Sequence, residues 1–109
     1  MGDHVLKTWP DAWDAIANGS KRFEWRRDDR GFAVGDWLIL EKWDPNSASP
    51  VLGNWGQPRT IDVRVTYILR GAFGIPDGFC VMSIRGATFN ESAQRLIERA
   101  TRMRAEVKP

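Results

Sequence analysis

A lysine set among aromatic residues is the side chain in this sequence with the clearest capacity for chemistry. Lys21 precedes Phe23 and Trp25 in the stretch that runs from residue 19 to residue 36. Apolar surroundings disfavour a charged ammonium, so a partly desolvated lysine can act as a base or a nucleophile near neutral pH. The alternative is a lysine whose stem covers apolar surface while its head group reaches water.

Glu24 lies between two arginines of the same stretch, Arg22 and Arg26. A helix is disfavoured there, because it would bring the two arginines together at i,i+4. In a strand Glu24 shares one face with both arginines, and Lys21 points to the other face. An acid held between two cations predicts a row that binds a ligand; the alternative is a solvated outer face of an edge strand. Joint action of Lys21 and Glu24 then requires a bulge, or a strand that begins near Ser20.

The chain as a whole has the composition of one globular domain, expected to span residues 1–109. Hydrophobic residues make up 42% of it, charged residues 28%, and the net charge is +2. No apolar run reaches the ~18 residues of a membrane span, and the N-terminal segment lacks a signal-peptide pattern, so we expect a cytoplasmic protein without a membrane partner. The histidine and cysteine content is too low for a zinc site, no metal or cofactor is expected, and Cys80 is expected to be an inert buried thiol.

Hydrophobic periodicity and turn residues predict five strands and two helices. The strands are expected over residues 4–8, 21–27, 37–43, 59–69 and 79–84. The helices are expected between Pro10 and Gly19 and over about residues 90–107. Because helices rarely separate successive strands, we predict an α+β fold built on a small, mostly antiparallel, barrel-like sheet with two flanking helices.

Three finer expectations concern the strands of this sheet. Strands 21–27 and 37–43 follow one another across a compact polar loop and are expected to pair antiparallel. Tyr67 is expected to lie on the same face of its strand as Val63 and Val65. Gly86 is expected to end the last strand.

Aromatic residues are the second unusual feature of the sequence. It contains 6 tryptophans, more than a domain of this size buries easily. Trp55 lies in residues 44–58, an irregular segment rich in proline and glycine that can close over a ligand or pack back on the body. Exposed aromatic side chains beside arginines suit stacking on a nucleic-acid base.

The stretch from residue 19 onward resembles the signature of the ASCH family, whose members are relatives of the PUA RNA-binding domain. In that signature a lysine follows a glycine, and an acid and then an arginine come after it; here the residues are Gly19, Lys21, Glu24 and Arg26. A small bacterial and phage branch of the family matches further. Its N-terminal motif is represented by His4, Leu6, Lys7 and Pro10, and its Asp-Arg-Gly-Phe and Val-Gly-Asp run by Asp29, Arg30, Gly31, Phe32, Val34, Gly35 and Asp36. The resemblance covers roughly residues 4–85.

The resemblance implies a PUA-like β-barrel with a cleft lined by the signature residues. In function the family is divided. Some members look like binders of RNA or modified bases. Others resemble a small bacterial amidohydrolase that removes the acyl group from N4-acetylcytidine and related acylated cytosines, with a lysine, a threonine and a glutamate and without metal. The lysine corresponds to Lys21, Glu24 occupies the threonine position, and the candidates for the glutamate are Glu41 and Glu24 itself.

The leading hypothesis is therefore an amidohydrolase that acts on acylated cytosine nucleosides. Lys21 would activate water, and Glu24 or Glu41 would orient the lysine or carry the proton to the leaving amine. Arg26 with a backbone amide would stabilise the tetrahedral oxyanion. The substrate-binding candidates are Arg26, Trp25, Lys7, Arg30 and Trp55, with Trp43 as a further residue that could stack on the pyrimidine.

Three other functions remain open at this point. A non-catalytic binder of RNA or modified nucleotides would show affinity that falls steeply with salt, because phosphate contacts release counterions. A ribonuclease would use Lys21 and Arg26 to stabilise a phosphorane. A purely structural module would leave the charged row unexplained.

Overall fold

The computed structural model describes residues 2–89 of the 109-residue chain. The predicted helix over about residues 90–107 lies outside the described residues. Within them the elements are β1 (Asp3–Thr8), α1 (Pro10–Ala17), β2 (Phe23–Arg27), β3 (Trp37–Asp44), β4 (Ser49–Pro50), β5 (Thr60–Arg70) and β6 (Phe79–Phe89). The five predicted strands and the predicted N-terminal helix are all present, and β4 is an additional strand of two residues.

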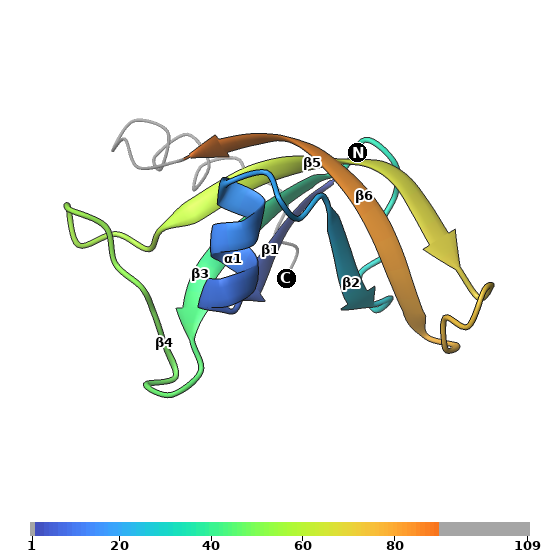
Figure 1. The fold of residues 1–109 in the computed structure, drawn as a ribbon, viewed down its shortest axis with the longest axis horizontal. Coiled ribbons are helices and arrows are strands. Elements are labelled where there is room, and N and C mark those ends of the chain that lie inside the picture. Colours follow the sequence, from blue (N-terminus) through green and yellow to red (C-terminus); the bar gives the residue numbers. More distant parts are fainter. Residues whose placement is uncertain (1, 90–109) are drawn as a thin grey trace, which may run out of the picture.

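The strands form one curved sheet of mostly antiparallel strands, with α1 on its concave side (Figure 1). Their order is β1-β3-β5-β6-β2, and β4 pairs with β3. Only the pairing of β1 with β3 is parallel. The prediction of a small sheet-dominated α+β fold is therefore confirmed. In the described residues the sheet is open: β1 and β2 are its edges, and no backbone pairing joins them.

The predicted antiparallel pairing of strands 21–27 and 37–43 is wrong. β2 pairs with β6, with Glu24 opposite Met82. β3 lies instead between β1 and β5, in the interior of the sheet, and its residues Leu38, Ile39 and Leu40 are all buried. The charged β2 takes an edge position, where polar side chains are tolerated.

Two further strand predictions are wrong because of β-bulges between β5 and β6. β6 continues past Gly86, whose positive φ of 72° lies within a register shift between the pairs at Asp62 and Arg64. Glycine relieves the strain of such a bulge, so it bends the strand without ending it. A second register shift, between Val65 and Tyr67, turns Tyr67 away from the core and leaves it 63% exposed.

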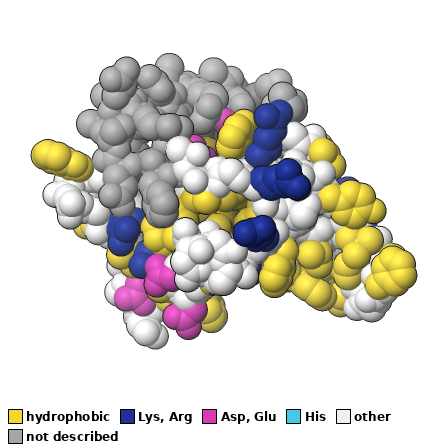
Figure 2. Space-filling model, turned by 45° about the horizontal axis from the view of Figure 1, so that its top comes forward, with side chains coloured by type: hydrophobic (Ala, Val, Ile, Leu, Met, Phe, Trp, Pro, Cys, Tyr) yellow, Lys and Arg dark blue, Asp and Glu magenta, His cyan; other side chains and the backbone are white. Residues whose placement is uncertain are grey.

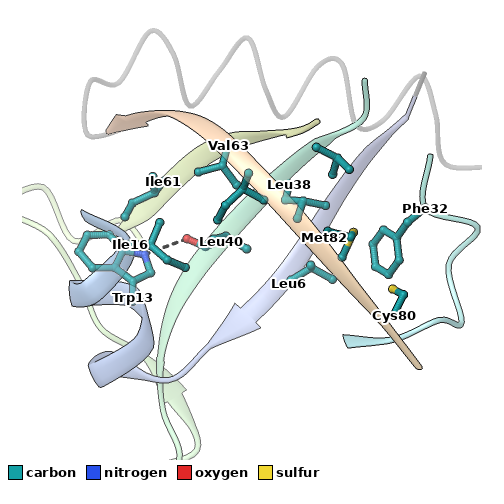
Figure 3. Packing of buried hydrophobic residues seen from close by; sticks show 12 residues of the cluster. Leu6, Trp13, Ile16, Phe32, Leu38, Leu40, Ile61, Val63, Cys80 and Met82 are labelled. Atoms are coloured by element: carbon teal, nitrogen blue, oxygen red, sulfur yellow. Dashed lines mark hydrogen bonds between the residues drawn. The ribbon is translucent and has the colours of Figure 1, made fainter. Parts of the chain in front are cut away.

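The core lies between α1 and the concave face of the sheet (Figure 3). Trp13 and Ile16 are the buried residues of α1, one turn apart on the same face of the helix. Trp13 also donates a hydrogen bond from its indole Nε1 to the backbone oxygen of Leu40 on β3, at 2.9 Å. This bond fixes α1 over the sheet and so determines where the chain leaves the helix. Cys80 is fully buried in the same core, as predicted.

Arginine side chains span the gap between the two edges of the sheet. Arg26 of β2 donates from Nη2 to the backbone oxygen of Lys7 on β1, at 2.9 Å. Arg30, in the segment after β2, donates to the backbone oxygen of Val5 at 3.0 Å. Carbonyl groups of an edge strand need partners, and here guanidinium groups supply them. No helix among the described residues is long and apolar enough to cross a membrane.

Candidate functional site

Three charged side chains of the predicted signature meet on the concave side of β2. Lys21 Nζ lies 2.8 Å from Glu24 Oε1, and Arg26 Nε lies 2.7 Å from Glu24 Oε2. The Glu24 side chain is only 3% exposed, whereas those of Lys21 and Arg26 are 22% and 24% exposed. A buried carboxylate is stable only when it is paired and hydrogen-bonded, and each oxygen of Glu24 has its own cation. We refer to Lys21, Glu24 and Arg26 as the ion trio.

The end of α1 explains how Lys21 reaches Glu24. Gly19 adopts a positive φ of 83°, which turns the chain after the helix, and the Lys21 amide then bonds to the backbone oxygen of Ala15 at 3.0 Å. β2 begins only at Phe23, so strand alternation does not govern Lys21. The predicted start of this strand at residue 21 is therefore wrong, and Lys21, which precedes β2, lies on the same side as Glu24.

The alternative of a solvated charged face on β2 is wrong. Glu24 lies opposite the buried Met82, so its face of β2 points into the molecule. The other face carries Phe23 and Trp25, which are 48% and 50% exposed. The strand therefore buries its carboxylate and exposes its aromatic residues. The two cations of the ion trio make this possible, because they compensate the buried charge.

Arg26 also connects the ion trio to β1. Besides its bond to Lys7, its Nη2 donates to Thr8 Oγ1 at 3.0 Å. The Thr8 side chain is buried at the end of β1. Thr8 is not among the predicted site residues, because nothing in the spacing of residues so distant from β2 indicates this contact. The Lys7 side chain itself points away and lies over the ring of Trp43, with Nζ 4.0 Å from the ring centroid.

A pocket of about 550 Å³ lies beside the ion trio, between the end of α1 and the part of β6 that runs past β2. Lys21 is the member of the trio that lines it. Arg22 lines it too, with its Nε bonded to the backbone oxygen of Gly19 at 3.2 Å. The opposite wall includes Thr66 and Ser83, which are hydrogen-bonded to each other at 2.7 Å. The pocket is large enough for a nucleoside.

Other predicted site residues are not brought to the ion trio. Alternation along β3 places Glu41 with Ile39, on the face opposite to the core residue Leu40. Trp25 lies on the outer face of β2, and Trp55 is 81% exposed on the segment between β4 and β5. Arg30 is bonded to the edge of β1 and is about half exposed. Of the eight predicted residues, Lys21, Glu24 and Arg26 thus form the site, and Lys7 contributes only its carbonyl oxygen.

A second carboxylate, Asp36, holds the N-terminal end of β1. It accepts hydrogen bonds from the amides of Gly2 and Ala33 at 2.8 and 2.9 Å, and it lies 2.8 Å from His4 Nε2. Burial by itself would raise the pKa of Asp36. The hydrogen bonds from Gly2, His4 and Ala33 outweigh burial and hold that pKa below its ordinary value. This cluster anchors β1, and therefore the carbonyl groups that Arg26 and Arg30 bind.

The donor chemistry of the site is limited to ammonium, guanidinium, carboxylate and hydroxyl groups. No set of three histidine, cysteine or carboxylate side chains in residues 2–89 could hold a metal ion. Burial raises the pKa of the Cys80 thiol, which disfavours the reactive thiolate. Lys21 and Glu24 are the groups of the ion trio that could exchange a proton with each other, since they share a hydrogen bond.

Comparison with known protein families gives a match. Residues 3–84 match the family model described as "Domain of unknown function (DUF3850)". The matched segment contains β1, α1, the whole ion trio and most of the sheet. No curated protein matches the chain.

Proposed function

The chain belongs to the DUF3850 family, and we propose that it is an amidohydrolase that removes the acyl group from acylated cytosine nucleosides such as N4-acetylcytidine, without a metal ion. One observation carries the proposal: Lys21 Nζ lies 2.8 Å from a buried carboxylate while the same lysine lines a pocket of nucleoside size. The resemblance to the ASCH signature supports it, since the signature lysine and acid are the residues in contact. In this proposal the curved sheet is part of a PUA-like barrel.

Glu24 acts through Lys21 in the proposed mechanism. Because the Glu24 side chain is buried, it does not touch the substrate. It positions Lys21, and it also accepts a proton from Lys21 and later returns it. In the resting pair Lys21 is an ammonium and Glu24 a carboxylate. Transfer of one proton along the short hydrogen bond produces a neutral amine and a carboxylic acid. The neutral Lys21 is then the general base.

Hydrolysis follows in two proton transfers. Lys21 takes a proton from water as the water oxygen attacks the acyl carbon, and a tetrahedral oxyanion forms. Lys21 then gives that proton to the cytosine N4 as the carbon–nitrogen bond breaks. The products are a carboxylic acid and the free amino group of cytosine. Glu24 finally returns its proton to Lys21, and the resting pair is restored.

The oxyanion is assigned to Arg22 in place of Arg26. Arg26 is not among the residues that line the pocket, and its Nε and Nη2 are occupied by Glu24, Lys7 and Thr8. Arg22 lines the pocket beside Lys21, and its bond to Gly19 uses only Nε. Its Nη groups can therefore donate to the developing negative charge, a contribution of about 3 kcal/mol in comparable sites. Arg26 keeps Glu24 in place.

Conversion of acetylcytidine to cytidine, followed by mass spectrometry with a chelator present, tests the proposal. We expect turnover by the folded protein and a loss of about 10²–10⁴-fold in Lys21→Ala, because the general base is removed. Lys42→Ala is the matched control: Lys42 pairs with Asp14 at 2.8 Å, outside the site. Near-normal turnover by a folded Lys21→Ala variant would remove Lys21 from the chemistry, and absence of turnover by the unaltered protein would reject the proposed activity.

A specific observation also favours a second candidate, binding of nucleic acid. Phe23 and Trp25 are exposed side by side on β2 although the strand is short and charged. The ion trio does not account for their exposure.

A further inference from the structure

The outer face of the sheet carries aromatic side chains from two strands. Phe23 and Trp25 come from β2, and Tyr67 from β5; they are 48%, 50% and 63% exposed. β6 lies between these strands, with Ser83 opposite both Phe23 and Tyr67, and Val81 opposite both Trp25 and Leu69. Exposed apolar surface of this extent in one place usually marks a binding surface.

Arginines lie at both ends of this aromatic face. Arg27 follows Trp25 on the same side of β2, and its guanidinium lies 5.5 Å from the ring centroid of Phe79. Alternation along β6 places the exposed Arg85 beyond Ser83 at the other end. We define the outer face by Phe23, Trp25 and Arg27 of β2, Tyr67 and Leu69 of β5, and Phe79, Val81, Ser83 and Arg85 of β6. None of these residues is acidic.

We propose that this outer face binds a single-stranded nucleic acid, with bases stacked on Phe23, Trp25 and Tyr67 and phosphates near Arg27 and Arg85. Side chains two residues apart on a strand are separated by roughly 6.6 Å, and side chains two strands apart by roughly 9.5 Å. Such spacing accepts bases that are splayed from one another, as in single strands bound to aromatic sheets. Figure 2 shows several basic side chains close to a broad apolar area on one side of the molecule.

A second copy of the chain fits this face less well. In a symmetric dimer the same face would meet itself, so the cations at its ends would face cations or apolar residues and no carboxylate of that face. Asp28, which follows Arg27, is already bonded to Arg70. A polyanion satisfies the arginines and the aromatic rings together.

The outer face is continuous with the pocket of the ion trio. Ser83 belongs to both, and its partner Thr66 lies in the pocket wall. A single-stranded nucleic acid bound across the outer face would therefore end beside the pocket that Lys21 lines. The inference itself does not depend on the proposed hydrolysis, because binding can be measured with unmodified strands.

Fluorescence anisotropy with the full chain tests the inference. The probes are labelled uridine and thymidine homopolymers of about 12 nucleotides, the length of an ordinary single-strand site, measured at about 50 and 200 mM salt. We expect binding that weakens with salt, and a loss of about tenfold in Trp25→Ala and in Tyr67→Ala, because each removes one stacking platform. The tighter probe identifies RNA or DNA as the ligand. An RNA duplex should compete poorly, since its bases are not available for stacking.

Trp9→Ala is the control variant, because Trp9 is 65% exposed at the start of α1, away from the outer face. It should bind as the unaltered protein does. The inference would be overturned if Trp25→Ala and Tyr67→Ala bound the single strands as tightly as the unaltered protein does. It would also be overturned if the unaltered protein bound the duplex as tightly as the single strands. Absence of binding together with a dimer that Trp25→Ala dissociates would assign the face to self-association. Deacylation of free acetylcytidine, measured in the same variants, reports separately on the proposed activity.

Discussion

The two faces of β2 reverse the usual distribution of polar and apolar side chains in an edge strand. Its inner face buries Glu24 between two cations, and its outer face exposes Phe23 and Trp25 to solvent. Burial of a carboxylate costs free energy unless it is fully paired, and exposure of aromatic rings forgoes the free energy of burying them. Neither arrangement is what a strand adopts for stability alone. The two proposals account for this difference: the inner face is proposed to serve proton transfer, and the outer face is proposed to serve stacking of bases.

The largest expected effect on stability comes from a substitution on the inner face of β2. Glu24→Gln removes the charge that compensates Lys21 and Arg26, and we expect a loss of about 3 kcal/mol in the free energy of unfolding. Urea denaturation measures it. Glu41→Gln is the matched control, because Glu41 lies on the opposite face of the sheet; it should change stability by less than ~0.5 kcal/mol. Equal effects of the two substitutions would mean that the ion trio has no special energetic role.

A smaller effect is expected where the inner face of β2 contacts β1. Arg26→Lys keeps the positive charge but cannot bind Glu24, Lys7 and Thr8 together, because an ammonium lacks the planar fork. We expect a loss of about 2 kcal/mol in stability and faster exchange of the amides of β1. Arg27→Lys, on the outer face, should leave both unchanged. Unaltered β1 exchange in Arg26→Lys would show that the edges are not held by this side chain.

Asp36 is a second buried carboxylate that can be compared with Glu24. Asp36 is held by two backbone amides and His4, whereas Glu24 is held by two cations. The pKa of Asp36 is lower in the folded state than its ordinary value of 3.8, so its contribution to stability is present above that value. It is lost as the pH falls through the lower, folded pKa. We therefore expect stability to decline in this acidic range and Asp36→Asn to flatten the decline. Chemical denaturation across pH measures it; an unchanged profile in the variant would contradict the assignment.

The smallest effect on stability is expected on the outer face of β2. Trp25→Ser removes an aromatic ring that is already half exposed, so the free energy of unfolding should change by no more than ~0.5 kcal/mol. Thermal or urea unfolding measures this change and compares it with the change caused by Glu24→Gln. A loss comparable to that of Glu24→Gln would mean that Trp25 is part of the core, and the proposed difference between the two faces would fail.

Local residue patterns were sufficient for α1 and for the described strands other than β4. Alternation and turn residues predicted β1, β2, β3, β5 and the start of β6, and proline, acidic residues and glycine predicted α1. These patterns depend on neighbours within a few residues, which the sequence displays directly. The buried residues Trp13 and Ile16 lie one turn apart, so the face of α1 that packs on the sheet also follows from local spacing.

Pairing and bulges were not predictable in the same way. The two strands expected to pair follow one another in the chain, yet β2 pairs with β6 from the far end of the described residues. The pairing partner of a strand depends on how all the strands of the sheet pack together, and that cannot be read from neighbouring residues. The turn of Tyr67 away from the core and the continuation of β6 past Gly86 depend on register shifts between two distant segments.

The sequence by itself predicted that Glu24 lies between two cations and that Arg26 is one of them. It named Arg22 as the other cation, whereas the structure has Lys21 in that place and Arg22 bonded to Gly19. It placed Lys21 inside the strand and on the face opposite to Glu24, whereas β2 begins only at Phe23 and the two side chains are in contact. Only the tertiary structure decided that this row points inward, that Arg26 reaches Thr8 and the edge of β1, and that Glu41 lies on the other side of the sheet. The physical reason is that a strand has two equivalent faces until packing buries one of them. That choice is made by residues far away in the chain.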